Sequence, residues 1–357
     1  SYGSGSCKTE DGRDDVAVGP LRAANQSFWA AVECAMPVLE RASFGAIVGV
    51  GPPGQPSKSA EKLLEQLRAM EAEYAKAHRA LPPEAREAVL TAQQDLEDAP
   101  GKRTLLEALG VARFSACFGR APGSPAWLVW NDALPDERQG ATRAAVVGKV
   151  SWGVKLGGVG LALDGGEASS LGCRSGCGAV LDTGTSLLGV PTEVYDAVKD
   201  FVVETGNDCT DLGQFPPLTL SIDGNEVHLP PDSYIGRMTG EPTGLMQGLV
   251  RTERLGGEAG CQLLLLDLGT ELTQFGPMVI IGMPFFRHFY TTFDLGEGPG
   301  SRALYFALAD DQCRPEQQAH PGASSLSRAR RSARPRVVDA SRLQAPRWLL
   351  GRRGLEL

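Results

Sequence analysis

The spacing of apolar and polar positions divides the first hundred residues into a β-rich stretch and a helical one. Between residues 1 and 51, Asp15–Gly19 alternates and Phe44–Val50 is a short apolar run that ends near glycine, a pattern typical of strands, the second of them buried. From about residue 55 to 100 apolar side chains recur every three or four positions on both sides of Pro82-Pro83. This period predicts two amphipathic helices that form a hairpin.

The pattern after residue 100 predicts a mostly β body. A short helical segment at 105–109 precedes strands at Phe114–Phe118, Trp127–Trp130 and Val150–Leu156. One longer helix is expected at Pro191–Val203, because an acid follows a capping candidate in its first turn. Many short strands and few helices are typical of a mostly β protein.

Charge separates the end of the chain from this body. Residues 314–357 carry ten Arg and only three acids, a balance of +7, so the remainder of a chain with net charge −8 stands near −15. The composition of this tail, rich in Arg, Ser, Ala and Pro, predicts disorder. The acidic body argues against nucleic-acid binding. The sequence contains no run of 18 apolar residues, so no membrane-spanning helix is expected.

The most informative motif is Asp182-Thr183-Gly184-Thr185-Ser186, which follows the apolar pair Val180-Leu181. It predicts a strand that delivers a carboxylate into a tight turn, where Gly184 lets the carboxylate lie near the loop amides. The hydroxyls of Thr185 and Ser186 can then donate hydrogen bonds to Asp182. Such a carboxylate can activate water when a second carboxylate shares its proton, so the motif predicts half of a catalytic pair.

An internal similarity suggests where the second carboxylate lies. Ala46–Val50 and Val279–Met283 each place two branched apolar residues before Gly. Asp182 precedes Gly282 by 100 positions, so a matching Asp would lie about 100 residues before Gly49. That position precedes Ser1, and we therefore expect this chain to be a piece of a longer protein.

The cysteines predict at least one disulfide. Cys173 and Cys177 bracket a three-residue turn that contains Gly, and a bridge there implies an oxidising compartment. The four His are scattered without ligand spacing to a Cys pair, so no metal site is expected. Pairing of the remaining cysteines stays open on this evidence.

In order along the chain, these motifs resemble the pepsin-like aspartic proteases, the two-lobed A1 family that includes cathepsin D-like and apicomplexan enzymes. The resemblance runs from residue 1 to about 310 outside the helical insertion. The segments that carry it are Tyr2–Ser6 (tip of the flap), Asn25–Phe28, Phe44–Gly49, Cys173–Cys177, Ala179–Ser186, Leu229–Ile235 and Ile280–Asp294.

The resemblance implies a mostly β, two-lobed acid-protease fold with an incomplete first lobe and an inserted helical hairpin at about 55–100. Residues 1–150 would be the remainder of the N-terminal lobe with a flap hairpin at 1–20, residues 151–313 the C-terminal lobe, and 314–357 the tail. By resemblance, a Cys209–Cys261 bridge is also expected, whereas Cys7, Cys34, Cys117 and Cys313 stay unassigned.

The implied function is hydrolysis of peptide bonds by water, with Asp182 as one of two catalytic aspartates and Thr183 to Ser186 supporting it. Tyr2, Gly3 and Ser4 would cover a polypeptide bound extended in a cleft. The family needs no metal or cofactor, and the resemblance implies a monomer in the secretory pathway, either vacuolar or lysosomal or extracellular.

Three departures and three rival interpretations qualify this hypothesis. No first Asp-Thr/Ser-Gly loop is present, and the chain alone is therefore expected to be inactive. Gly45 and Met283 stand where the family usually has Asp, and we interpret both as tolerated variation, because neither position takes part in bond cleavage in the family mechanism. A phosphoryl-transfer protein would need alternating strands and helices. A retroviral-type protease of two identical chains is disfavoured by the two apolar-Gly runs. A non-catalytic family member that binds peptides is the third alternative.

Overall fold

The computed structural model describes residues 6–35, 45–53, 56–98, 103–121, 123–135, 140–163, 168–206, 209–244, 246–255, 260–315 and 335–345. The chain forms two compact units. One unit comprises residues 11–30 and 49–111, and the other comprises residues 1–10, 31–48 and 112–357. None of the helices in the described ranges is long and apolar enough to cross a membrane.

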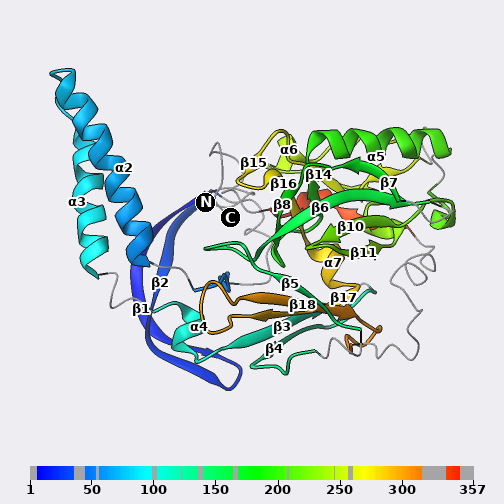
Figure 1. Cartoon of the computed structure of the whole chain (residues 1–357), viewed down its shortest axis with the longest axis horizontal. Coiled ribbons are helices and arrows are strands. Elements are labelled where there is room, and N and C mark those ends of the chain that lie inside the picture. Colours follow the sequence, from blue (N-terminus) through cyan, green and yellow to red (C-terminus); the bar gives the residue numbers. More distant parts are fainter. Residues whose placement is uncertain are drawn as a thin grey trace. The chain divides into compact units, whose positions relative to one another are not determined.

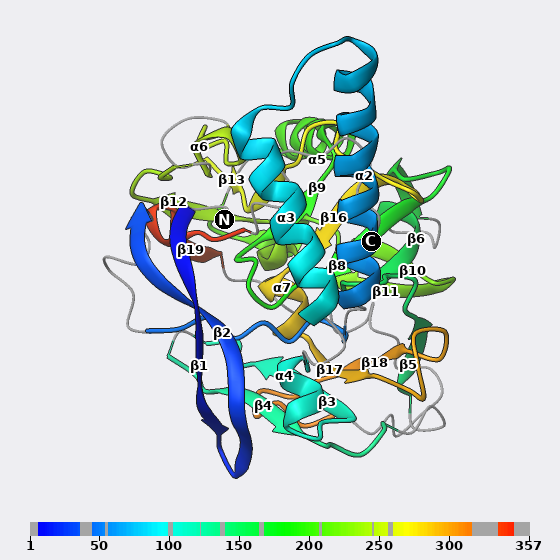
Figure 2. The same ribbon diagram turned by 90° about the vertical axis from the view of Figure 1, so that its left-hand side faces the viewer.

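The smaller unit contains the predicted helical hairpin. Helix α2 (Pro56–Lys76) and helix α3 (Pro83–Asp98) lie side by side, in agreement with the helical period of the sequence (Figure 2). Leu64 and Ala92 are buried there. The four-residue helix α4 (Leu105–Ala108) follows, and its capping box joins Thr104 to Glu107 at its start.

A long β-hairpin precedes these helices. Strands β1 (Ser6–Val18) and β2 (Leu21–Ala35) pair with each other, and Gly19 takes a positive φ of 58° in the turn between them. A disulfide joins Cys7 to Cys34 across the open end of the hairpin. The residues expected to cover a bound peptide, Tyr2, Gly3 and Ser4, lie outside the described residues. The turn of the described hairpin therefore falls at residues 19–20, beside the end of the region where a flap was expected.

In its described residues the larger unit is mostly β, as the sequence predicts, and these strands form three sheets (Figure 1). The largest has the order β11-β10-β6-β8-β16-β9-β14, with β7 beside β6 and β15 beside β16. Its strands are β6 (Gly153–Ala162), β7 (Ala168–Gly172), β8 (Cys177–Leu181), β9 (Leu188–Val190), β10 (Leu218–Ile222), β11 (Asn225–Leu229), β14 (Leu265–Asp267), β15 (Leu272–Thr273) and β16 (Gly276–Ile281).

The second sheet has five antiparallel strands in the order β4-β3-β17-β18-β5. These strands are β3 (Arg113–Phe118), β4 (Ala126–Trp130), β5 (Thr142–Ala145), β17 (Phe289–Asp294) and β18 (Ala303–Leu308). The third sheet has the order β13-β12-β19. Its strands are β12 (Ile235–Thr239), β13 (Gln262–Leu263) and β19 (Arg336–Asp339).

An aromatic cluster fills the space around helix α7 (Met283–Phe286), which lies between the large sheet and the five-stranded sheet (Figure 1; Figure 2). The rings of Phe114 and Phe293 stack with centroids 4.7 Å apart, and Trp152 meets Phe293 edge-on at 5.1 Å. On the other side of this core, Phe285 stacks on Phe289 at 4.6 Å. Buried aromatic pairs of this kind contribute about 1 kcal/mol each beyond their burial, and they fix α7 against the five-stranded sheet.

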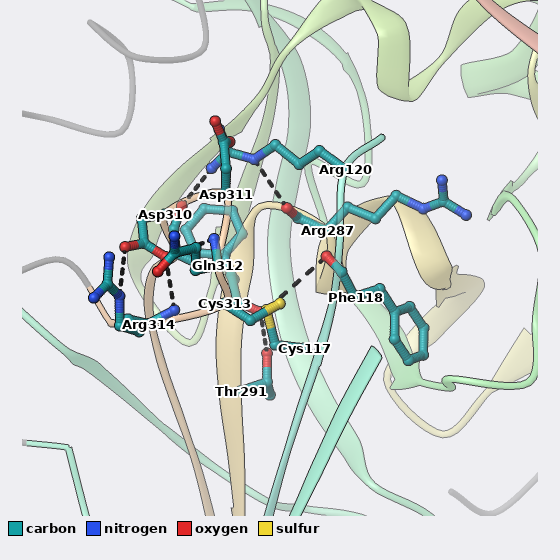
Figure 3. The surroundings of a disulfide bond; sticks show 12 residues. Cys117, Phe118, Arg120, Arg287, Thr291, Asp310, Asp311, Gln312, Cys313 and Arg314 are labelled. Atoms are coloured by element: carbon teal, nitrogen blue, oxygen red, sulfur yellow. Dashed lines mark hydrogen bonds and ion pairs between the residues drawn. A yellow bond between two sulfur atoms is a disulfide. The ribbon is translucent and has the colours of Figure 1, made fainter. Parts of the chain in front are cut away.

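A disulfide and an arginine hold one corner of this unit (Figure 3). Cys117 at the end of β3 is bonded to Cys313, 196 positions later in the chain. Arg120 donates from Nε to the carbonyl of Arg287 at 3.1 Å, and its guanidinium also binds the Ala309 carbonyl and lies 3.1 Å from Asp311. The end of α7 and the chain after β18 are thus tied to β3.

The other bridges join Cys173 to Cys177 and Cys209 to Cys261, as expected, and all eight cysteines are paired. Helix α5 (Thr192–Thr205) agrees with the predicted helix, although its N-cap is Pro191. Instead of capping the helix, the Thr192 hydroxyl donates to Asp267 at 2.6 Å.

Two predictions are wrong. The run Ala46–Val50 forms no strand, and Ile47 and Val48 are about half exposed, at 48% and 50%, so it does not repeat the buried run at Val279–Gly282. The tail is also not disordered throughout, because residues 335–345 contain β19 and the turn η5 (Ala340–Arg342). Strand pairing with β12 supplies the order that the composition of this segment does not predict.

Asp267 is expected to make stability depend on pH. Burial would raise the pKa of Asp267, but hydrogen bonds from Thr192 and Gly269 and the Arg251 guanidinium outweigh it and hold this pKa below its usual value. The stability it contributes should be present above pH 4, near the pKa of an unfolded Asp, and lost as pH falls through the folded pKa. In urea unfolding at pH 7, Asp267→Asn should cost about 1–3 kcal/mol, and the difference should shrink below pH 4.

The matched control is Asp196→Asn, which removes a more exposed carboxylate 3.3 Å from the same Arg251. Because exposed ion pairs are screened by water, this change should cost less than about 1 kcal/mol. Equal losses for the two variants, or a loss for Asp267→Asn that does not vary with pH, would contradict the assignment.

Candidate active site

Asp182 lies directly after β8, and the backbone there is held from both sides. Strand β8 pairs parallel with β16, with Leu181 opposite Ile281, and antiparallel with β6. The Leu181 N–H donates to the carbonyl of Trp152 at 3.0 Å, and the Asp182 N–H donates to the carbonyl of Ile281 at 3.0 Å. All five residues of β8 are buried, so the strand fixes the position from which the Asp182 side chain emerges.

The loop itself orients the carboxylate. The Gly184 N–H donates to Oδ1 of Asp182 at 2.9 Å, and the Thr185 hydroxyl donates to Oδ2 at 2.6 Å. Thr185 is fully buried, whereas Asp182 is partly exposed. Both oxygens therefore accept a hydrogen bond from a fixed donor, which sets the orientation of the carboxylate while leaving it accessible to solvent.

The loop crosses the end of β16 at Gly282. The Met283 N–H donates to the Thr185 carbonyl at 2.8 Å, so the chain after β16 is bonded to the loop after β8. A Cβ atom on Gly282 would lie 2.1 Å from the Leu187 carbonyl oxygen and 2.6 Å from that of Thr185. Only glycine permits this approach of two backbones.

Ser186 does not hold Asp182, in contrast to the prediction from the sequence. Its N–H donates to the carbonyl of Gln344 at 3.0 Å, and its Oγ accepts from the Gln344 N–H at 2.9 Å. Among the described residues, the Asp182 side chain accepts hydrogen bonds only from the Gly184 N–H and the Thr185 hydroxyl. Thr183 is partly buried within the loop. Gly184 and Thr185 therefore bind the Asp182 carboxylate, whereas Ser186 binds the tail segment.

Gln344 lies next to the Asp182 loop, and the sequence did not predict this contact. A cavity of about 240 Å³ is lined by residues of the tail segment, of the loop and of α7. Its walls are formed by Ser186, Leu187, Ser233, Leu264, Met283, Pro284, Arg287, Arg336, Val337, Val338, Asp339, Arg342 and Leu343. The β-branched pair Val337-Val338, next to a turn-forming Asp, is the one signal in the tail that would have indicated a strand.

Charge on the tail side of this cavity is carried by arginines. Burial lowers the pKa of the Arg336 guanidinium, an effect that the negative charge of Asp232 partly opposes. Asp339 lies 3.4 Å from Arg342 and accepts from Ser341, so its charge is used within the tail segment itself. In the described part of the chain, no group of three or more His, Cys, Asp or Glu is arranged to hold a metal ion.

Chemically, Asp182 can accept a proton from a water molecule or donate one to a carbonyl oxygen. A single fixed carboxylate performs one of these steps, and a second must perform the other. Within the described ranges, the hydrogen bonds to the Asp182 carboxylate come only from donors of its own loop. The described geometry therefore provides one carboxylate in a fixed orientation.

Comparison with known proteins gives one family. Residues 139–299 match the family model described as eukaryotic aspartyl protease. Among curated proteins, gastricsin of Callithrix jacchus is 37% identical over 144 residues, which cover 38% of this chain and 31% of the relative. Pepsin A of Gallus gallus is 30% identical over 125 residues, covering 34% and 29% respectively. The chain spans about a third of the length of these relatives.

The fold has a counterpart among solved structures. The crystal structure of an aspartic proteinase from Irpex lacteus superimposes with a TM-score of 0.52 over 87% of this chain and 81% of that protein. Its sequence identity of 16% means that this likeness concerns the fold alone.

The crossing at Gly282 gives a stability prediction. Because a methyl group there would meet two carbonyl oxygens, Gly282→Ala should lower the free energy of unfolding by about 3 kcal/mol. Gly158→Ala in β6 is the control, since a Cβ there meets nothing within 4 Å and the change should be within about 0.5 kcal/mol. Urea unfolding of both variants measures the difference, and similar values would contradict the crossing.

Proposed function

We propose that this protein is an aspartic-type endopeptidase, on the premise that its residues 139–299 belong to the pepsin-like family of aspartyl proteases. Asp182 would be one of two catalytic aspartates that share a proton, one as base towards water and the other as acid towards the scissile carbonyl. The substrate would be a polypeptide bound in extended form, and neither metal nor cofactor takes part.

The observation that carries the proposal is the double support of Asp182. A carboxylate that emerges from a fully buried strand and accepts from both an amide and a buried hydroxyl is held in one orientation. Preorganised donors of this kind cost no rearrangement during the reaction, so the oxygens are ready to take a proton from water. An ordinary surface Asp in a turn has no such buried framework.

A second function is supported by a specific observation. This sequence holds one Asp-Thr/Ser-Gly loop, and among the described residues the Asp182 carboxylate accepts hydrogen bonds only from Gly184 and Thr185 of that loop. A catalytically inactive relative that binds peptides would need only the cleft and the loop. We keep this as the alternative, and its test is the same as that of the enzyme.

The wider setting of the protein follows from the same premise. Four disulfides are consistent with an extracellular or secretory route, where oxidising conditions preserve them. Within that route we place the protein in a vacuolar or lysosomal compartment or outside the cell, as a monomer. The proposed division is an N-terminal lobe up to residue 150 and a C-terminal lobe at 151–313 that carries Asp182.

The test is cleavage of an unfolded protein between pH 3 and 6 by the longest form that the gene encodes. Asp182→Asn keeps an oxygen for the Gly184 N–H but cannot exchange the proton, so kcat/KM should fall by about 10²–10⁴-fold. The matched control is Asp211→Asn, because Asp211 accepts from the Gly213 N–H at 2.8 Å in the same local arrangement and lies outside the site.

Retention of more than a tenth of the activity by Asp182→Asn would overturn the role of Asp182. Complete inactivity of the parent protein, combined with measurable binding of the same peptides, would favour the alternative function.

A further inference from the structure

The tail segment 335–345 is built into the larger unit by strand pairing. Strand β19 runs parallel to β12, with Arg336 opposite Gly236 and Asp339 opposite Thr239. The approach is close, since a Cβ on Gly236 would lie 2.5 Å from the Arg336 carbonyl oxygen. An edge strand that accepts another strand in this way binds through main-chain hydrogen bonds and depends little on sequence.

The chain then turns towards the catalytic loop. Oδ1 of Asp339 accepts from the Ser341 N–H at 3.0 Å and from its hydroxyl at 2.7 Å, which closes the turn η5. Leu343 is extended, with φ −66° and ψ 143°, and is 3% exposed. Together with Ala340 and Ala345, Leu343 packs in the hydrophobic cluster that contains Leu187 of the loop.

The contact with the loop uses only the backbone of Gln344. Its carbonyl accepts from the Ser186 N–H and its N–H donates to the Ser186 hydroxyl, four positions after Asp182. The main-chain N–H and carbonyl of Gln344 are thus both satisfied by Ser186. A clamp of this kind fits any polypeptide backbone, because it reads no side chain.

We propose that segment 335–345 is an internal pseudosubstrate that occupies the peptide-binding position beside the Asp182 loop. This inference rests on the proposed function, because it concerns the regulation of the same site. Ser186 has one N–H to donate, so a substrate backbone and Gln344 cannot both use it. Segment 335–345 itself carries only two Arg and one Asp, a net charge of +1, so its pairing with β12 and its buried side chains support the bound state more than charge does.

The first experiment tests the contact itself, independently of catalysis. Hydrogen–deuterium exchange at residues 182–190 is compared between the parent chain, Gln344→Pro and Gln344→Ala. Proline removes the N–H that binds Ser186, and the extended Leu343 before it is compatible with proline. We expect at least tenfold faster exchange at the Ser186 amide in Gln344→Pro and no change in Gln344→Ala. Equal exchange in all three proteins would overturn the inference.

The second experiment tests competition. The probe is an octapeptide in which a hydroxyethylene group replaces the central peptide bond, and its binding is measured by calorimetry at pH 4.5. A chain that ends at Arg334 should bind the probe at least tenfold more tightly than the full chain, and Gln344→Pro should lie between them. Equal affinities, including no binding to either chain, would overturn the inference. Failure of the proposed function is read separately from the Asp182→Asn comparison above.

Discussion

The close approach of two backbones at Gly282 is the constraint on which the site depends. Strand β16 ends where the loop after β8 passes over it, and the carbonyls of Thr185 and Leu187 fill the space that a side chain would need. Because the Asp182 N–H and the Met283 N–H are both bonded across this crossing, the loop cannot shift without breaking the sheet beneath it. The carboxylate is thereby positioned by β8, all of whose residues are buried, and by the buried end of β16.

Helix α7 connects this crossing to the rest of the unit. The helix begins immediately after Gly282, and its Phe285 and Phe286 are fully buried against the five-stranded sheet. At its other end Arg120 holds the Arg287 carbonyl, near the disulfide that joins Cys117 to Cys313. A change in the loop would therefore be resisted by the aromatic core as well as by the strand pairing.

The sequence predicts those parts of the fold in which local pattern and tertiary environment agree. The helical period of α2 and α3, the strand before Asp182 and the Cys173–Cys177 bridge are all found. At Ala46–Val50 the apolar pattern is misleading, because burial of such a run depends on neighbouring strands that a local pattern cannot specify. The hydrogen bonds of Ser186 could not be predicted from local sequence either, because their partner Gln344 lies 158 positions away in the chain. The tail strand was also not predicted, because a composition with ten arginines indicates disorder and only the pair Val337-Val338 indicates a strand.

The bridge between Cys117 and Cys313 has a consequence for any molecule that approaches the loop. It anchors the chain 22 positions before Pro335, so the tail segment is never far from its own docking strand. A tethered segment behaves as a ligand present at an effective concentration on the order of millimolar, whatever the concentration of the protein. A free peptide must therefore exceed that local concentration, or bind correspondingly more tightly, before it reaches the carboxylate. Dilution of the protein would not relieve this competition.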